Sequence, residues 1–496
     1  MRARTWLRDA LALSFLALSA ILLQGYHYGF EDQAIWLPAI KKFLNPSLYP
    51  HDSIFFLAQT RFSHFPQLMA SFIKLTSLPT DLSVFLWHLF SIFLVLLGCL
   101  KLSRLCFPNP LSQWAAVATI WVARLTPMAG PHLNLMDRYL HPRDLATGLL
   151  LLALVAVLQR SFTALIWIAL AAALHPTMAI FGAFHLAIQA WKQPRKLWSL
   201  TLSAAAALAL LFSVYYFKPV PDPAWHEILA SRPYLFPLKW PWYFWICTAA
   251  VFATLSWIAG IALRRELPMV QHVSRRILIS GIIGIAGAVL ITTIPSFERF
   301  IPAEPMRTLH LVYFLLVFLG GGLLGETVLQ NHPLRWFLFL FPIAVIFFAG
   351  NKIVYSSSPY IEVPGRLPRN EWVIAFDWVR KNTPNDALFA LDPHYMTRPA
   401  EDHHGFRAFA ERSALADWVK DRSVSALEPQ LASRWRQEES DIDNWQHFTS
   451  DDLQRLKQKH GVNWVILERG LNPSLQPSAS LSCPYSNSDI LVCTLP

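Results

Sequence analysis

Eight consecutive residues hold the densest group of side chains that could do chemistry. They run from Asp137 to Asp144 and include Arg138, His141 and Arg143. A carboxylate can act as a general base, and Arg and His groups bind phosphate or pyrophosphate. A salt-bridged loop before a helix, with an acid in the first turn, would use the same residue types. We favour a functional site here, in which Asp137 is catalytic and the other four residues bind substrate.

A second acidic pair, Glu31-Asp32, follows the first apolar segment of the chain. A carboxylate at a membrane surface beside an apolar wall can keep a useful basicity, so either residue is a candidate catalytic base. An acidic N-cap of the following helix explains the pair equally well, and the sequence leaves both interpretations open. His51 and Asp52 lie later in the same segment and could join the pair as substrate-binding groups.

Three more polar residues stand where apolar segments begin or end: His175, Arg307 and His310. An arginine at the membrane is costly, and it is usually paired or functional, although an arginine that reaches to the interface is the simpler alternative. His175 precedes a proline in a pattern that is most typical of a structural turn. We include all three among the candidate substrate-binding residues.

Metal and nucleotide motifs are absent from the sequence. It holds no Walker loop, no GxGxxG after a strand, no HExxH and no paired CxxC. We therefore expect no metal site and no cofactor, although a divalent metal is compatible with these residues. Cys483 and Cys493 are ten residues apart. They could form a disulfide in an oxidising compartment or stay as two free thiols.

The composition indicates a membrane protein. Of the 496 residues, 54% are hydrophobic and 15% are charged, and the charges fall between long apolar runs. The net charge of +10 could suggest nucleic acid. However, many basic residues lie in short loops beside apolar runs, as in membrane proteins that follow the positive-inside rule. We expect contact with a lipid bilayer and no nucleic-acid partner.

About eleven apolar segments are predicted to be membrane-spanning helices. They are 6–25, 82–102, 111–128, 144–159, 162–175, 176–191, 196–217, 241–263, 275–293, 308–326 and 333–350. The start, Met1-Arg2-Ala3-Arg4, indicates an uncleaved first helix with a cytoplasmic N-terminus. Residues 26–81 then form a first external loop within a membrane domain of residues 1–350.

The segment 162–191 decides the sidedness of everything after it. It is either two short helices joined at His175-Pro176 or one kinked helix. With two helices, the later cytoplasmic loops hold eight basic residues: Lys192, Arg195, Lys196, Arg264, Arg265, Arg275, Arg276 and Arg335. The later external loops hold five: Lys218, Arg232, Lys239, Arg299 and Arg307. Since cytoplasmic loops carry the excess of Lys and Arg, we favour two helices.

After about residue 351 the composition becomes polar. Glu371 to Lys381 is predicted to be a helix, Ala387 to Leu391 a strand, Asp451 to Lys459 a helix, and Asn463 to Leu467 a buried strand. The fold class is therefore an α-helical polytopic membrane protein with a small soluble α/β domain at residues 351–496. With eleven spans, this domain is extracytoplasmic.

Together these features resemble the GT-C class of integral-membrane glycosyltransferases. The resemblance rests on the acidic pair after helix one, the acidic and basic cluster in the next external loop, Arg307 at a late outer helix end, and the α/β tail. The stretch from Trp378 to Phe389 (WVRKNTPNDALF) is similar to a sequence common in external domains of such enzymes. The patterns at 406–418 and 459–467 continue the likeness.

The resemblance implies sugar transfer from a polyprenyl-phosphate donor to an acceptor hydroxyl on the outer side of a bacterial cytoplasmic membrane, with inversion. Glu31 or Asp32 would take the acceptor proton, while Arg138, His141, Arg143 and Arg307 would offset the phosphate charge. The acceptor (glycan, lipid or protein) stays open. Two alternatives also stay open: a transporter or flippase of a lipid-linked glycan, and a non-catalytic glycan- or lipid-binding protein.

Overall fold

A computed structural model describes residues 2–191, 195–216, 220, 222–398, 404–471, 475 and 481–495. Lys192 and Lys218, which entered the charge comparison, lie outside the described residues, as does residue 217 of a predicted helix. The chain forms two compact units. Unit 1 comprises Met1–Gly25, Leu86–Pro219 and Ser231–Gly350, and unit 2 comprises Tyr26–Phe85, Val220–Ala230 and Asn351–Pro496. The first loop thus belongs to the same unit as the C-terminal segment.

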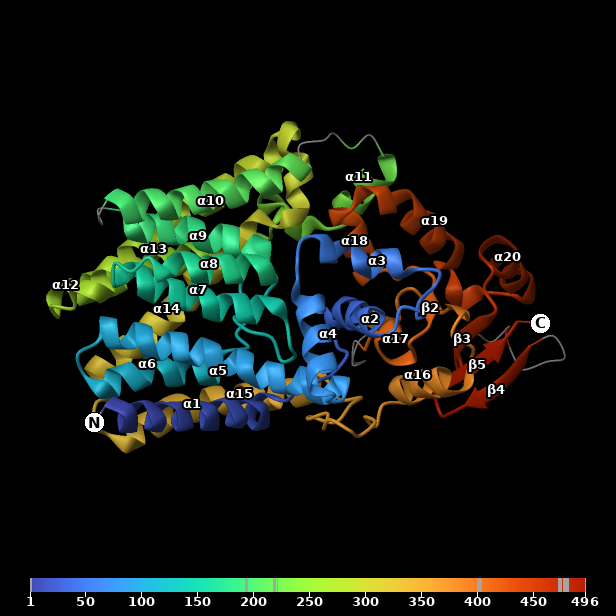
Figure 1. Cartoon of the computed structure of the whole chain (residues 1–496), viewed down its shortest axis with the longest axis horizontal. Helices are drawn as coiled ribbons and strands as arrows, with labels where there is room; N and C mark the ends of the chain where they lie inside the picture. Colours follow the sequence, from blue (N-terminus) through green and yellow to red (C-terminus); the bar gives the residue numbers. More distant parts are fainter. Residues whose placement is uncertain are drawn as a thin grey trace. The chain divides into compact units, whose positions relative to one another are not determined.

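Unit 1 is helical. Its long elements are α1 (Arg2–Gln24), α5 (Thr80–Cys106, which begins in unit 2), α6 (Pro110–Ala123), α7 (Pro142–Leu158), α8 (Thr163–Leu174), α9 (Pro176–Ala190), α10 (Arg195–Tyr216), α12 (Trp242–Arg264), α13 (Pro268–Thr293), α14 (Leu309–Leu324) and α15 (Pro333–Val354, which ends in unit 2). Its short elements are η2 (Pro233–Leu235), η3 (Pro237–Lys239), η4 (Pro295–Ala303), η5 (Pro305–Thr308) and the π-helical turn η6 (Gly325–Leu329). In Figure 1 the neighbouring helices α7, α8, α9 and α10 run alongside one another.

Six helical segments among the described residues are long and apolar enough to cross a membrane. They are Trp6–Gln24, Thr80–Cys106, Trp242–Arg264, Pro268–Thr293, Pro305–Leu329 and Pro333–Val354. Large apolar side chains on these segments are exposed, including Trp257 at 63% and Ile346 at 67%. Such an apolar exterior is expected where helices face lipid, so the chain is a multi-pass membrane protein. The other predicted spans contain α6, α7, α8 and α9, which have 14, 17, 12 and 15 residues, and α10, which has 22 residues.

Residues 162–191 form two helices, α8 and α9, that meet at His175-Pro176. The backbone of His175 is extended (φ −151°, ψ 88°), and its side chain accepts a hydrogen bond from Met178 N at the start of α9. A proline at the first helical position needs no hydrogen-bond acceptor for its missing N–H. The chain therefore ends one helix and begins the next at this dipeptide, in agreement with the two-helix alternative.

Unit 2 combines short helices with one sheet. Its helices are α2 (Gln33–Leu44), α3 (Ser53–Leu57), α4 (Phe65–Thr76), α11 (Pro223–Ala230), α16 (Glu371–Asn382), α17 (Phe406–Ala410), α18 (Lys420–Leu427), α19 (Ala432–Ile442) and α20 (Ser450–His460). Single 3-10 turns are η1 (Ala58–Arg61), η7 (Tyr395–Thr397), η8 (Pro429–Leu431) and η9 (Trp445–His447). The strands are β1 (Leu388–Ala390), β2 (Ser413–Ala414), β3 (Trp464–Glu468), β4 (Ser482–Ser486) and β5 (Ile490–Thr494).

The sheet has the order β2-β1-β3-β5-β4, with β1 parallel to β2 and β3, and β5 antiparallel to β3 and β4. Local sequence explains its flanking helices. Thr449 and Asp452 form a capping box at the start of α20, and Gly461 ends that helix in the left-handed conformation (φ 76°). The predicted α/β character of the C-terminal segment, including the helix at 371–381 and the strand at 463–467, agrees with these elements.

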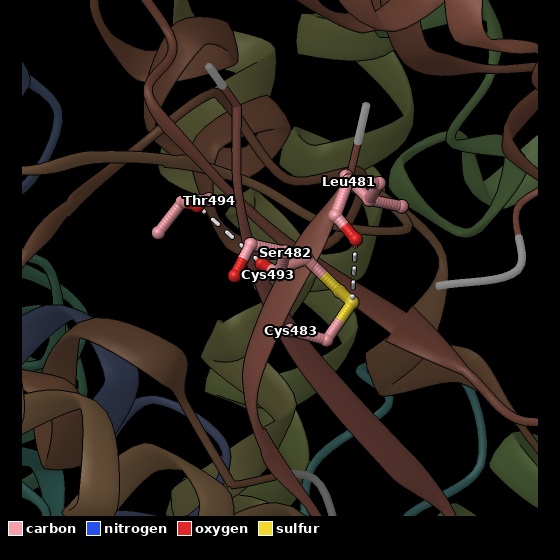
Figure 2. Close-up of a disulfide and its surroundings, with 5 residues drawn as sticks. All are labelled: Leu481, Ser482, Cys483, Cys493 and Thr494. Carbon is pink, nitrogen blue, oxygen red and sulfur yellow. Dashed lines mark hydrogen bonds between the residues drawn. A yellow bond between two sulfur atoms is a disulfide. The ribbon is translucent and has the colours of Figure 1, made fainter. Parts of the chain in front are cut away.

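The two C-terminal cysteines are bonded. Cys483 on β4 and Cys493 on β5 form a disulfide between neighbouring antiparallel strands (Figure 2). Cys99 and Cys106 are buried free thiols, and Cys247 is an exposed one. The structure therefore selects the disulfide from the two alternatives that the sequence left open.

Candidate functional site

The cluster in unit 1 is organised by the start of α7. Pro142 occupies the first helical position, and the Nδ1 atom of His141 accepts a hydrogen bond from Arg143 N at 2.9 Å. Because Nδ1 accepts this bond, a neutral His141 ring carries its proton on Nε2, where it can donate. The His-Pro dipeptide at 141–142 thus fixes both the helix start and the orientation of the imidazole.

A buried ion pair lies beside this helix start. Arg143 Nη2 donates to Asp137 Oδ2 at 2.5 Å, and the two side chains are 3% and 6% exposed. Asp144 Oδ2 accepts from Asp137 N at 3.2 Å, and Arg124 Nη1 donates to Asp137 O at 2.9 Å. These groups come from α6, α7 and the loop between them. Since a buried charge is stable only when it is paired and hydrogen-bonded, each carboxylate here depends on its neighbours.

Two residues from distant parts of the chain extend the cluster toward its exposed edge. The ring centroids of His141 and His175 lie 5.8 Å apart, and Arg307 Nη1 lies 3.5 Å from His175 Nε2. Arg307 Nε donates to Glu304 Oε2 at 2.6 Å, and these two side chains are 18% and 12% exposed. A continuous series of contacts therefore runs from the buried aspartates to a partly exposed arginine.

Two more histidines hold the turn that carries Arg307. His185 on α9 contacts Ser280 Oγ and Thr308 O, both at 2.7 Å, and His310 Nε2 contacts Leu135 O at 3.1 Å. The space between them is small. A cavity of about 10 Å³, lined by His185, Arg307 and His310 among others, has room for about one water molecule. A ligand as large as phosphate would therefore approach from the exposed edge of Arg307.

The cluster combines arginines and acids. Its arginines are Arg124, Arg143, Arg307 and Arg232 (whose Nη2 lies 4.0 Å from Glu304 Oε1), and its acids are Asp137, Asp144 and Glu304. Guanidinium groups bind phosphate oxygens, so an anionic ligand suits these residue types.

The acidic pair lies in unit 2 and is bound by a lysine. Lys420 Nζ donates to Glu31 Oε2 at 2.6 Å and to Asp32 Oδ1 at 2.9 Å. Burial disfavours the ammonium, but Asp32 and Glu31 outweigh it and raise the pKa of Lys420 above its ordinary value. Glu31 has a positive φ of 50°, a conformation that costs free energy in a residue with a side chain. Asp32 also occupies the N-cap position of α2.

His51 and Asp52 have separate partners in unit 2. His51 Nε2 lies 3.0 Å from Asp386 O, at the surface. Asp52 is buried, accepts from Ala414 N at 3.0 Å, and is bonded to Arg407 Nε. Arg407 Nη1 also donates to Asp421 Oδ2 at 2.9 Å. Because Asp421 follows Lys420 in α18, the acidic pair and Asp52 are linked through adjacent residues of one helix.

The structure divides the predicted residues between the two units. Glu31, Asp32, His51 and Asp52 lie in unit 2. Unit 1 joins six of them: Asp137, His141, Arg143, Asp144, His175 and Arg307. Arg138 is partly exposed next to Asp137, and His310 lies one turn after Arg307. Sequence reasoning missed Arg124, His185, Glu304 and Lys420. Glu304 could have been found from the sequence, because an acid three residues before an arginine is often placed to form an ion pair with it.

Comparison with known proteins gives two findings. Residues 370–438, within unit 2, match the family model of a domain of unknown function, DUF6798. The structure is similar to that of the archaeal oligosaccharyltransferase AglB from Archaeoglobus fulgidus, which was solved with an inhibitory peptide and a dolichol-phosphate. The likeness has a TM-score of 0.46 and 12% identity, and covers 92% of this chain and 69% of that chain. No curated protein matches the sequence.

Proposed function

We propose that the protein is a membrane glycosyltransferase that uses a polyprenyl-phosphate-linked sugar. The observation that carries this proposal is the cluster of unit 1, in which Arg143, His175 and Arg307 converge from three parts of the chain. Its arginines lie at the ends of apolar helices. A lipid phosphate is an anion attached to an apolar chain, so its two parts match the two features of this site.

The phosphate binds at Arg307 in this proposal. Arg307 uses Nε for Glu304 and keeps donors on its other nitrogens, and His175 lies within 3.5 Å of one of them. Planar guanidinium groups bind phosphate oxygens in pairs. Glu304 competes for the same guanidinium, so it acts as a partner that the phosphate displaces. His141 lies close to His175 and adds a second imidazole on the buried side.

The reaction is an inverting displacement. The acceptor oxygen forms a bond to the anomeric carbon of the sugar, and the bond from that carbon to the phosphate oxygen breaks. A carboxylate accepts the acceptor proton, and the polyprenyl phosphate leaves with the bonding electrons. Glu31, Asp32 and Asp137 are the candidate bases. The Asp137 carboxylate is engaged by Arg143, so it would have to give up this ion pair to take the proton.

The acidic pair is held by Lys420, so a base role requires that the lysine shift its hydrogen bond when the acceptor binds. Both carboxylates bind the same ammonium group. One of them can therefore take the proton while the other stays bonded to Lys420. Asp52, neutralised by Arg407, has a positioning role in this proposal, and His51 and Arg138 contact substrate. We expect no cofactor in the reaction.

The disulfide supports an extracytoplasmic location of residues 351–496, because disulfides persist in oxidising compartments. In this proposal the protein is a multi-pass protein of the bacterial cytoplasmic membrane with a cytoplasmic N-terminus. A reporter fused after the last residue tests this topology, and reporter activity in the cytoplasm would contradict it.

Phosphate binding is tested with long-chain polyprenyl phosphate and the full-length protein in detergent. We expect Arg307→Gln to weaken binding about tenfold or more, as the loss of a charge-assisted hydrogen bond of about 1.5–3 kcal/mol implies. Glu304→Gln removes the competing carboxylate and should strengthen binding. Arg335→Gln, at an exposed arginine of unit 1 outside the cluster, is the matched control. Equal affinity in all four proteins would refute the proposed site.

A second candidate function is non-catalytic binding of a lipid-linked glycan. One observation favours it, because Glu31 and Asp32, the candidate bases in unit 2, are already paired with Lys420. Sugar transfer from radiolabelled lipid-linked donors extracted from membranes separates the two functions. Catalysis predicts that Glu31→Gln or Asp32→Asn abolishes transfer and keeps polyprenyl phosphate binding. Transfer that is unchanged in both variants would exclude a base role for this pair.

A further inference from the structure

Three segments of unit 2 that are far apart in the sequence meet through short backbone contacts. Tyr26 N donates to Tyr360 O at 3.2 Å, and Glu362 N donates to Tyr26 O at 2.9 Å. Gly405 N donates to Gly29 O at 2.9 Å. These bonds hold residues 26–30, 360–362 and 404–405 in fixed register. Side chains that project from them are therefore placed by the backbone and not by flexible loops.

Each of these segments contributes one residue to a buried group of His27, Glu362 and His404. His27 Nδ1 lies 3.1 Å from Glu362 Oε1, and His404 Nε2 lies 2.8 Å from the same oxygen. The ligand atoms that the three residues offer all lie within 4.8 Å of one another. Their side chains are 1–2% exposed. Two imidazoles thus converge on one carboxylate oxygen in the interior of unit 2.

The chemistry of the group fits a divalent transition metal. Two imidazole nitrogens and one carboxylate are a common set for Zn²⁺, and a tetrahedral ion with ligand distances of roughly 2.0–2.2 Å places ligand atoms roughly 3.3–3.6 Å apart. The two contacts to Glu362 Oε1, at 3.1 and 2.8 Å, are shorter than this spacing, so the ligands would move apart by less than about 1 Å when the ion binds.

Surrounding contacts orient the ligands, as is usual at metal sites. The second oxygen of Glu362 accepts from Tyr28 N at 2.8 Å. Phe30 packs against both imidazoles, with ring centroids 5.4 Å from His27 and 6.1 Å from His404. Glu362 also lines a cavity of about 390 Å³ together with Tyr28, so one of the three proposed ligands borders an open space.

We propose that His27, Glu362 and His404 bind one Zn²⁺-like divalent metal ion, which fastens the first loop to the C-terminal segment within unit 2. The sequence led us to expect no metal site. It gives no motif here, because Glu362 is 335 positions from His27 and 42 positions from His404. The proposal does not rest on the glycosyltransferase function, and either can fail without the other.

The test uses full-length protein in detergent, stripped with a chelator and titrated with Co²⁺ alone. We expect one equivalent to produce the visible absorption of tetrahedral Co²⁺, and Zn²⁺ to remove it. Glu362→Gln and His404→Gln should lose this absorption. The matched control is His394→Gln, which alters a second described group of possible ligands: the partly exposed His394, the buried Glu439 and the exposed Asp443. It should bind Co²⁺ as the wild type does.

Thermal unfolding of the wild type provides a measurement that does not depend on a variant's ability to fold. We expect the chelator to lower the melting temperature and Zn²⁺ to restore it, since a ligand that binds only the folded state stabilises it. A wild-type protein that neither binds Co²⁺ at one equivalent nor responds to Zn²⁺ would overturn the proposal. It would also be overturned if His394→Gln, and not His404→Gln, abolished binding.

Discussion

The ion pair between Asp137 and Arg143 allows the structural and catalytic roles of the unit 1 cluster to be separated. Both side chains are almost fully buried, at 6% and 3% exposure. Two unit charges about 4 Å apart attract by about 4 kcal/mol at an effective dielectric constant of roughly 20. Removal of one partner of a buried pair costs a similar amount, about 3–5 kcal/mol, because the remaining charge loses its counter-ion. We therefore expect Asp137→Asn alone, or Arg143→Met alone, to destabilise strongly.

The double variant, Asp137→Asn with Arg143→Met, should recover much of this loss. It has no unpaired charge, since a neutral amide and an apolar side chain of similar length replace the pair. The coupling free energy of the double-mutant cycle should reach about 2 kcal/mol or more. The assay is thermal or denaturant unfolding of the four proteins in detergent. The control is Lys381→Met, which removes an exposed lysine from Asp377 and leaves that carboxylate its bond to Arg380, so it should cost less than about 1 kcal/mol.

The same four proteins also test catalysis. If Asp137 only positions Arg143, the double variant should regain polyprenyl phosphate binding to the extent that it regains stability. If Asp137 takes part in the reaction, sugar transfer should stay absent in the double variant although the protein is stable. A coupling free energy near zero, with small losses in both single variants, would refute the buried ion pair itself and with it the electrostatic argument for the site.

Two further predictions concern unit 2. Cys483→Ser should lower the free energy of unfolding by about 2–3 kcal/mol, because the bond to Cys493 closes a loop of about ten residues in the unfolded chain. Wild-type protein melted with a reductant should be as stable as the variant. A variant as stable as the oxidised wild type would contradict the prediction. Lys420→Met should cost about 1–2 kcal/mol at neutral pH, since Glu31 and Asp32 are then left without a shared cation. Asp32 and Glu31 raise the pKa of Lys420 in the folded protein. The stabilisation that Lys420 gives the fold is therefore fully present below the ordinary lysine pKa of about 10.4. It is lost as the pH rises through the higher folded-state pKa. The difference in melting temperature between wild type and variant should stay constant from about pH 7 to pH 9 and shrink only at more alkaline pH.

Local sequence determined the positions of most elements. Apolar runs in a chain of this length form helices because the backbone must satisfy its own hydrogen bonds in lipid. The start of α9 was also readable, since it has a histidine N-cap and a proline at the first helical position. The helix α7 begins in the same way at Pro142, two residues before the predicted start at residue 144. The same two dipeptides carry His141 and His175, so the signal that marks these helix starts also marks two residues of the cluster.

The partners of the candidate residues were not readable from the sequence. Lys420 is 389 residues from Glu31, and Arg307 is 132 residues from His175. Neither pair forms a sequence motif with a recognisable spacing, because the two residues of each pair meet only when distant elements pack in the folded chain. The buried group of His27, Glu362 and His404 was missed for the same reason: each residue alone resembles an ordinary polar residue in a loop.

The sequence by itself determined that the protein is built of apolar helices with an α/β segment at its end, and it indicated which short stretches concentrate charge. Hydrophobicity, helix caps and charge density are local properties, so they can be read from neighbouring residues. Tertiary structure decided which charges neutralise one another, that residues 26–85 join the C-terminal segment in one unit, and that Cys483 bonds Cys493. These outcomes depend on which surfaces pack together, and packing joins residues that the sequence keeps far apart.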